Sequence, residues 1–192
     1  MKNELERLEE RGLSSELIYD GSVVHLYVDR VQLPNGNTSI REYVKHIGAV
    51  AVLPLTEQNE VICVRQYRYA HRCLLTEIPA GKLDSADEDH VKAALRELRE
   101  ETGAVCKRLT HLGLFRSTPA ILDEKIDLYL AEGLTFGDTD PDEDEFLEIE
   151  KIPLATLVEE VMQGKITDGK TQVAVLKVNE LLRRRTEQKE NL

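Results

Sequence analysis

The stretch GKLDSADEDHVKAALRELREETGA, residues 81–104, is the most informative part of this sequence. It carries the run Arg-Glu-Leu-Arg-Glu-Glu between one glycine in a loop and a second at Gly103. On a helix Glu97, Glu100 and Glu101 stand at i, i+3 and i+4, so their carboxylates crowd one face. Like charges this close repel one another, and a hard divalent cation such as Mg²⁺ suits a set of oxygen ligands. The spacing therefore predicts a divalent-metal site on a helix.

Local signals predict the limits and the packing of that helix. Ser85 followed by Glu88 has the form of a capping box, so we expect Ser85 as the N-cap and Gly103 as the stop. An apolar stripe follows at helical spacing: Val91, Leu95, Leu98 and Thr102. It lies about 120° around the helix from the glutamates, which predicts that the stripe packs on a core while the acids face a cleft. A solvated acidic face is the alternative, but this triplet comes with Arg96 and two bracketing glycines.

The same residues resemble the Nudix box, the signature of the Nudix hydrolases. That pattern is glycine, five residues, glutamate, seven residues, Arg-Glu, an aliphatic, any residue, Glu-Glu, any residue, glycine and an aliphatic. This chain supplies its positions in order as Gly81, Glu88, Arg96, Glu97, Leu98, Glu100, Glu101, Gly103 and Ala104. Six residues rather than five separate Gly81 from Glu88, and Ala104 is small for the last position. Neither departure touches the metal-binding half of the box.

Composition limits the class of protein. The 192 residues suit one domain, or one domain with a small appendage, and an apolar content of 41% is enough for a core. The net charge of −11 argues against nucleic-acid binding, which needs clustered Lys and Arg. The three cysteines lack CxxC spacing, which predicts reduced thiols in a cytoplasmic protein. We see no signal peptide and no long apolar run, so we expect no membrane partner.

Periodicity and turn residues predict a mixed α/β architecture. Residues 22–33 and 38–45 predict a hairpin around Asn35-Gly36, and residues 2–11 a short helix. Further strands are expected at 48–55, 60–66, 73–78, 109–115, 125–134 and 145–152, and further helices at 153–163 and 171–185. We therefore expect residues 1–45 to form a small N-terminal β-hairpin domain. Residues 46–192 would form an α/β/α sandwich with a mixed β-sheet, the fold that the Nudix resemblance also implies.

The resemblance narrows to the ADP-ribose pyrophosphatase branch of the Nudix hydrolases over about residues 20–185. It is carried by residues 64–68, 77–81, 117–120 with 123–124, 142–145 and 166–171. Pro119 falls sixteen residues after Gly103, where that branch has a distinguishing proline, whereas Ala120 replaces its glycine. The resemblance implies hydrolysis of the diphosphate of ADP-ribose to AMP and ribose 5-phosphate, with Mg²⁺ as cofactor or Mn²⁺ in its place.

The resemblance also implies roles for named residues. Glu97, Glu101 and the carbonyl of Ala80 would bind metal, with Glu100 joining directly or through water. Arg96 cannot be a metal ligand, and its guanidinium more plausibly braces the glutamates through charge-assisted hydrogen bonds.

The base that takes the proton of the attacking water would come from outside the helix. The resemblance favours Glu143, followed by Glu145 and Glu124. Eight of the thirteen residues from 138 to 150 are acidic, however, and such a run is usually a solvated loop.

Substrate contacts are expected from Arg68, Arg65, Pro119 and Glu124. Arg68 is the stronger of the two arginines, because Arg65 points to the opposite face of its strand. The partners implied are a small nucleoside diphosphate sugar and a second copy of the chain in a homodimer. Three alternatives stay open: another nucleoside diphosphate sugar such as GDP-mannose, a non-catalytic Nudix-like sensor, and an interaction protein that uses its acidic loop.

Overall fold

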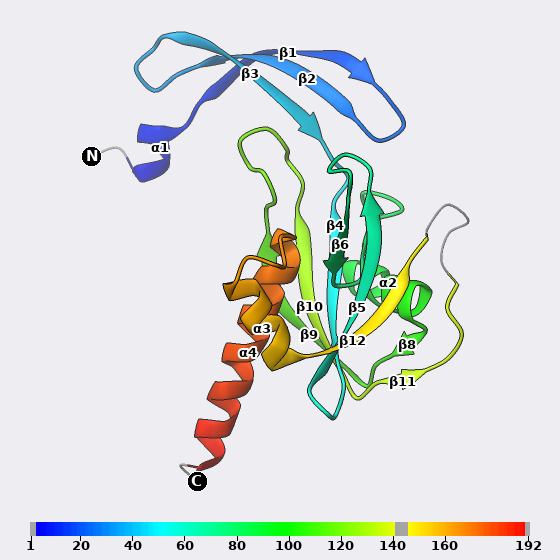
Figure 1. The fold of residues 1–192 in the computed structure, drawn as a ribbon. Helices are drawn as coiled ribbons and strands as arrows, with labels where there is room; N and C mark the ends of the chain where they lie inside the picture. The colour runs from blue at the N-terminus through cyan, green and yellow to red at the C-terminus, as the bar shows by residue number, and fades with distance from the viewer. Residues whose placement is uncertain (1–2, 141–145, 191–192) are drawn as a thin grey trace. The chain divides into compact units, whose positions relative to one another are not determined.

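The computed structural model describes residues 3–140 and 146–190, and its contacts divide the chain into two units (Figure 1). The first unit comprises Met1–Ile47 and Arg116–Lys125, and the second comprises Gly48–Phe115 and Ile126–Leu192. None of the helices in the described residues combines the length and the apolar composition that a membrane span requires.

The first unit is built on a three-stranded antiparallel sheet in the order β1-β2-β3. A short helix, α1 (Glu4–Leu8), precedes β1 (Arg11–Asp20), β2 (His25–Gln32) and β3 (Thr38–Lys45). The predicted hairpin of β2 and β3 is confirmed. Strand β1 was not predicted, because it is exposed at every position and so lacks the apolar alternation that marks a half-buried strand.

Residues 116–125 belong to the first unit because they pair with β3 and with the residue after it. The Val44 N–H donates to the Ile121 carbonyl (2.8 Å), and the Asp123 N–H donates to the Val44 carbonyl (3.1 Å). The Asp123 carboxylate in turn accepts the N–H of His46 (2.6 Å).

The second unit contains a seven-stranded mixed sheet in the order β12-β5-β4-β10-β9, with β6 paired to β5 and β7 to β4. Its strands are β4 (Ala49–Leu55), β5 (Glu60–Arg68), β6 (Cys73–Glu77), β7 (Ala80–Lys82), β9 (Arg108–Phe115), β10 (Ile126–Glu132) and β12 (Glu148–Pro153). Strands β4 and β10 are parallel, and the other pairs are antiparallel. Two short strands, β8 (Ala104–Val105) and β11 (Thr135–Phe136), pair separately. The longer strands were predicted, whereas β7, β8 and β11 were missed.

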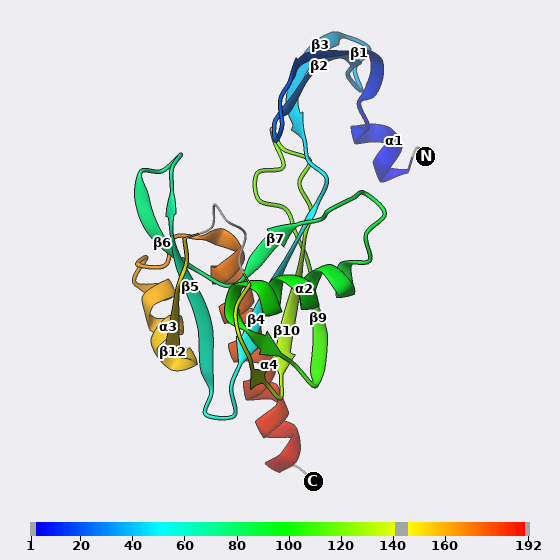
Figure 2. The same cartoon turned by 90° about the vertical axis from the view of Figure 1, so that its right-hand side faces the viewer.

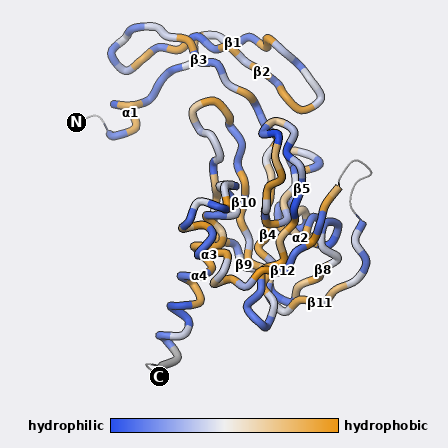
Figure 3. The backbone as a smooth tube through the Cα atoms, in the orientation of Figure 1, coloured by the Kyte–Doolittle hydropathy of each residue, from blue (hydrophilic) through white to orange (hydrophobic). Residues whose placement is uncertain are grey.

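Helices cover both faces of this sheet. Helix α2 (His90–Thr102) lies in front of it in Figure 2, and α4 (Gly169–Glu190) lies behind, next to α3 (Leu154–Met162). Strand β4 is buried at every position, and hydrophobic residues run along it in Figure 3. Val50 and Val52 belong to the core under α2, and Ala51 and Leu53 to the core under α3 and α4. The predicted α/β/α sandwich is thus confirmed, since successive strand residues serve opposite faces.

Candidate active site

Helix α2 begins later than the sequence predicted. Its first residue is His90 and its N-cap is Asp89, whose carboxylate accepts the N–H of Lys92 (2.9 Å). The prediction that Ser85 is the N-cap was wrong, because residues 85–88 form a turn in which the Glu88 N–H donates to the Ser85 carbonyl (3.1 Å). Serine and aspartate are both good caps, so local preference did not separate them.

The predicted end of α2 is confirmed at Gly103, which has a φ of 67° in the left-handed region that favours glycine. A Cβ on Gly103 would lie 2.3 Å from the Gly137 carbonyl oxygen, so the site also demands a residue without a side chain. The Gly137 N–H donates to the Gly103 carbonyl (2.8 Å), and the Asp140 N–H donates to the carbonyl of Glu100 (2.9 Å). Residues 137–140, which lead into the acidic loop, are therefore fastened to the end of α2.

The buried face of α2 differs from the predicted stripe. Val91 and Leu95 are exposed by 47% and 38%, so the prediction that they pack on the core was wrong, whereas Leu98 and Thr102 are buried. The buried residues of the helix are Ala93, Ala94, Glu97, Leu98, Glu101 and Thr102. Because Glu97 and Glu101 lie on this face, they point toward the sheet and not away from the core.

The carboxylates of Glu97 and Glu101 meet the backbone of β7 at two consecutive residues. Glu101 Oε2 accepts the N–H of Ala80 (3.2 Å), and a Cβ on Gly81 would lie 2.1 Å from the carboxyl carbon of Glu97. Glu97 and Glu101 are only 8% and 3% exposed. The absence of a side chain at Gly81 is therefore what lets the Glu97 carboxylate approach the strand.

Arg96 lies among carboxylates as the sequence predicted. Its Nη1 donates to Glu97 (2.6 Å) and Glu100 (3.2 Å), and its Nη2 approaches Glu88 (3.4 Å) and the Lys82 carbonyl (3.3 Å). Burial opposes the guanidinium charge, but the carboxylates, Glu97 foremost, outweigh it and raise the pKa of Arg96. Its buried Nε has no hydrogen-bond partner among the described residues. Arg96 thus fixes the Glu97 carboxylate from the helix side.

Glu100 stands apart from the other two glutamates. Its carboxylate pairs with Arg96 (3.2 Å) and Arg99 (3.6 Å), and its side chain is 26% exposed. Accordingly, residues 3–140 and 146–190 contain no group of three or more His, Cys, Asp or Glu side chains arranged to hold a metal ion. The two carboxylates that meet the backbone of β7 are those of Glu97 and Glu101.

A second cluster of charged residues surrounds Glu77 at the end of β6, and Arg68 is the member of it that the sequence predicted as a site residue. Arg68 donates Nε to Glu77 Oε1 and Nη2 to Oε2, both at 2.7 Å. Lys170 contacts the same Oε2 and also donates to Asp168 (3.1 Å). Asp168 stands directly before α4. An aspartate at this position is a typical N-cap, and this was the one sequence signal that could have pointed to Asp168.

The charge of Glu77 is stabilised although the residue is only 1% exposed. Burial alone would raise the pKa of this carboxyl, but Arg68 and Lys170 outweigh burial and lower it to about 2. The Arg68 guanidinium is thereby held in a fixed orientation by a buried carboxylate.

The remaining predicted site residues have separate surroundings. Arg65 is half-buried on β5, opposite Glu148 of β12. Pro119 and Glu124 lie in the first unit, where Pro119 is exposed and Glu124 accepts a hydrogen bond from Ser117 Oγ (2.6 Å). Glu143 and Glu145 fall in residues 141–145, outside the described residues.

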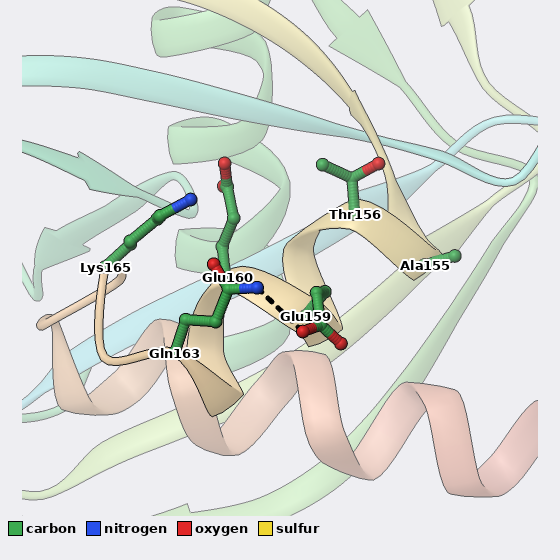
Figure 4. A pocket seen from close by; sticks show the side chains of 6 residues that line it. All are labelled: Ala155, Thr156, Glu159, Glu160, Gln163 and Lys165. Carbon is green, nitrogen blue, oxygen red and sulfur yellow. Dashed lines mark hydrogen bonds between the residues drawn. The ribbon is translucent and has the colours of Figure 1, made fainter.

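A hollow on the surface of α3 contains none of these residues. It is lined by Ala155, Thr156, Glu159, Glu160, Gln163 and Lys165 (Figure 4). Gln163 Nε2 donates to Glu159 Oε1 (2.7 Å) within it. Because no predicted site residue lines this hollow, we assign it no role in the candidate active site.

Comparison with known proteins places these observations in a family. Residues 45–174 match the NUDIX domain, and residues 10–44 match the nucleoside diphosphate sugar hydrolase N-terminal domain. The chain is 43% identical over 169 residues to the methanol dehydrogenase activator of Bacillus methanolicus, and this match covers 87% of this chain and 91% of the relative. It is 42% identical over 173 residues to the ADP-ribose pyrophosphatase of Bacillus subtilis (strain 168), which covers 89% and 93%.

A solved crystal structure of an ADP compounds hydrolase has the same fold. Its TM-score is 0.81 at 22% sequence identity, and the match covers 92% of this chain and 96% of that one. The NUDIX match includes the whole stretch from residue 81 to residue 104. The chain therefore belongs to the Nudix family.

Proposed function

We propose that this Nudix hydrolase cleaves the diphosphate of ADP-ribose to AMP and ribose 5-phosphate, with water as nucleophile and Mg²⁺ as cofactor. The observation that carries the proposal is the convergence of the Glu97 and Glu101 carboxylates on Ala80 and Gly81. The substrate is taken from the Bacillus subtilis relative, which is an ADP-ribose pyrophosphatase at 42% identity.

The residues at this place fit a divalent cation. Two carboxylates that are almost completely buried face one short backbone segment, and their negative charges attract a cation. Carboxylate and carbonyl oxygens are the ligands that Mg²⁺ prefers, and Mn²⁺ accepts the same set. Glu97, Glu101 and the Ala80 carbonyl would hold the ion, with Glu100 joining directly or through water. When bound, the ion offsets the negative charge of the diphosphate and activates water.

Arg96 has the proposed role of a positioning residue. Its Nη1 donates to Glu97 (2.6 Å), and the missing side chain of Gly81 leaves room for the same carboxylate at β7, so both residues define where the carboxylate lies. A planar guanidinium suits this role because it is always charged and its N–H groups have fixed directions.

Glu143 is the proposed general base, with Glu145 and Glu124 as second and third choices. The support is that Asp140, three residues earlier in the chain, is hydrogen-bonded to the backbone of Glu100 at the end of α2 (2.9 Å). Glu143 follows this anchored residue by three positions in the sequence.

Substrate contacts are proposed for Arg68, Arg65, Pro119 and Glu124. Arg68 is the best supported, because its bidentate bond to Glu77 orients the guanidinium of a side chain that is 41% exposed. A fixed guanidinium recognises phosphate oxygens with little loss of side-chain entropy.

The form of the enzyme that we propose is a cytoplasmic homodimer in which residues 1–45 serve dimerisation and substrate contact. The cysteines are free thiols, as a reducing compartment requires. The match of residues 10–44 to the nucleoside diphosphate sugar hydrolase N-terminal domain supports a substrate-related role for this part.

The substrate is tested by incubating the purified protein with Mg²⁺ and a panel of ADP-ribose, GDP-mannose, UDP-glucose, NADH and diadenosine polyphosphates. ADP-ribose should be among the best cleaved, with AMP and ribose 5-phosphate as products and no cleavage after chelation of the metal. A preference for GDP-mannose would make GDP-mannose the substrate in place of ADP-ribose. If no compound is cleaved, the non-catalytic ligand-sensing module is the interpretation that stays.

A further inference from the structure

The start of α4 is hydrogen-bonded to Ile78, which lies two residues before Ala80 of the proposed metal site. Thr171 has no exposed surface, and its Oγ1 accepts the N–H of Ile78 (2.9 Å). The same hydroxyl donates to Asp168 Oδ2, which also accepts the Thr171 N–H (2.9 Å). Because its proton goes to Asp168, the hydroxyl oxygen is oriented as an acceptor for Ile78.

Lys170 makes a parallel connection one residue earlier. Its ammonium bridges the Glu77 and Asp168 carboxylates, and Lys170 is itself only 8% exposed. Two consecutive residues of α4 therefore contact Glu77, the last residue of β6, and Ile78, the residue after it. The contacts join parts of the chain that are 93 residues apart.

The backbone between Ile78 and Ala80 is fixed from both faces of the sheet. The Pro79 carbonyl accepts the N–H of Val52 (2.8 Å), and proline itself has no N–H. The Ala80 N–H donates to Glu101 of α2 (3.2 Å), whereas the Ile78 N–H donates to Thr171 of α4. Since α2 and α4 cover opposite faces, the segment is held between the two helical layers.

We propose that Thr171 and Lys170 are positioning residues that set the place of the Ala80 carbonyl relative to the carboxylates of Glu97 and Glu101. This inference rests on the proposed function, in which Ala80 is a metal ligand. Without the Thr171 hydroxyl, the buried N–H of Ile78 loses its acceptor, and the segment shifts to find another. Groups that orient metal ligands typically change metal affinity by about 10–100-fold when they are removed.

Thr171→Val tests the proposal, because valine keeps the shape of threonine and removes only the hydroxyl's hydrogen bonds. The dissociation constant of Mn²⁺, measured from free Mn²⁺ by electron paramagnetic resonance, should rise at least about tenfold. The Mg²⁺ concentration for half-maximal ADP-ribose hydrolysis should rise in proportion, while KM at saturating Mg²⁺ stays within about twofold.

Matched variants separate positioning from a general loss of stability. Thr171→Ser restores the hydroxyl and should restore tight Mn²⁺ binding. Thr186→Val removes an exposed threonine on the same helix and should leave Mn²⁺ binding unchanged. Lys170→Met, which removes the ammonium that bridges Glu77 and Asp168, should weaken Mn²⁺ binding in the same direction and serves if Thr171→Val does not fold.

The outcomes distinguish this inference from the proposed function. If Thr171→Val has a lower Tm but the wild-type affinity for Mn²⁺, the positioning role is refuted and the hydroxyl only stabilises the fold. If the wild-type protein binds Mn²⁺ and Thr171→Val weakens it, yet ADP-ribose is not cleaved, the positioning role stands and the proposed function fails.

Discussion

At the scale of single residues, Gly81 sets how closely the Glu97 carboxylate of α2 approaches β7. A Cβ at this position would overlap the Glu97 carboxyl group at 2.1 Å. We expect Gly81→Ala to displace that carboxylate and to weaken Mn²⁺ binding by about 10–100-fold while the protein stays folded. Gly12→Ala is the control, because Gly12 also lies in a strand and a Cβ there meets no atom within 4 Å. Equal Mn²⁺ affinities for the two variants in a titration would contradict the proposed geometry.

Glu143 is the residue on which the proposed chemistry depends most. Glu143→Gln keeps the size of the side chain and removes its ability to take a proton, so kcat should fall by about 10²–10⁴-fold. Mn²⁺ affinity should stay at the wild-type value, because metal binding is assigned to other residues. Glu145→Gln is the matched comparison in the same loop. A near-normal kcat for Glu143→Gln, together with a large loss for Glu145→Gln, would move the base to Glu145.

At the scale of elements, the cluster of Arg68, Glu77, Lys170 and Asp168 joins β5, β6 and α4. The Glu77 carboxyl has its pKa lowered from 4.5 to about 2 by Arg68 and Lys170, which outweigh burial. A lowered folded-state pKa stabilises the protein above pH 4.5, and this stabilisation is lost as pH falls from there toward 2. We expect it to be on the order of 3 kcal/mol at neutral pH.

Urea unfolding from pH 7 downward tests this stabilisation. Glu77→Gln should lower the free energy of unfolding at pH 7, and its difference from the wild type should narrow below pH 4.5. Glu180→Gln is the control, because the pKa of Glu180 is also lowered to about 2 but its partners lie at the surface. Exposed ion pairs contribute little, so that variant should stay close to the wild type. If Glu180→Gln lowers the free energy of unfolding as much as Glu77→Gln does, burial of the ion pair is not what makes the Glu77 contribution large.

The elements were predicted better than the contacts between them. Strand β3 has the predicted bounds, because alternation and the Asn-Gly turn are local signals. Strand β1 was missed since all its residues are exposed, and the helix start was misplaced because Asp89 and Ser85 are equally good caps. The spacing predicted three glutamates on one face of a helix, and their assignment as metal ligands stays a prediction. The burial of Glu97 and Glu101 but not of Glu100 was not predicted, because it depends on how α2 lies against β7.

The ion pair between Glu77 and Lys170 is the clearest example of a contact that local sequence patterns do not predict. It spans 93 residues and joins a strand end to a helix start, so no local pattern in either segment predicts it. The pair becomes evident only when the sheet and α4 are both in place.

At the scale of the whole molecule, the exposed strand β1 of the first unit supports the proposed homodimer. Strand β1 is exposed along its entire length, including Leu13, Leu17 and Tyr19. Exposed apolar residues gathered on one strand are typical of an interaction surface. We expect a dimer at about 10 μM in sedimentation velocity, and Leu17→Glu should shift it toward monomer. Met162→Glu, an exposed apolar residue of α3, is the control, and a monomeric wild type would contradict the dimer.

The central claim is that a divalent metal held by Glu97 and Glu101 at Ala80 drives the cleavage of ADP-ribose. It is tested most directly by measuring AMP release against Mg²⁺ concentration for the wild type, Glu97→Gln and Glu100→Gln. Glu97→Gln should lose at least about 100-fold in kcat, more than the loss typical of groups that only orient a ligand. Glu100→Gln should lose about tenfold or less, because the Glu100 carboxylate pairs with Arg96 and Arg99. Equal losses in the two variants, or AMP release that does not depend on Mg²⁺, would contradict the account.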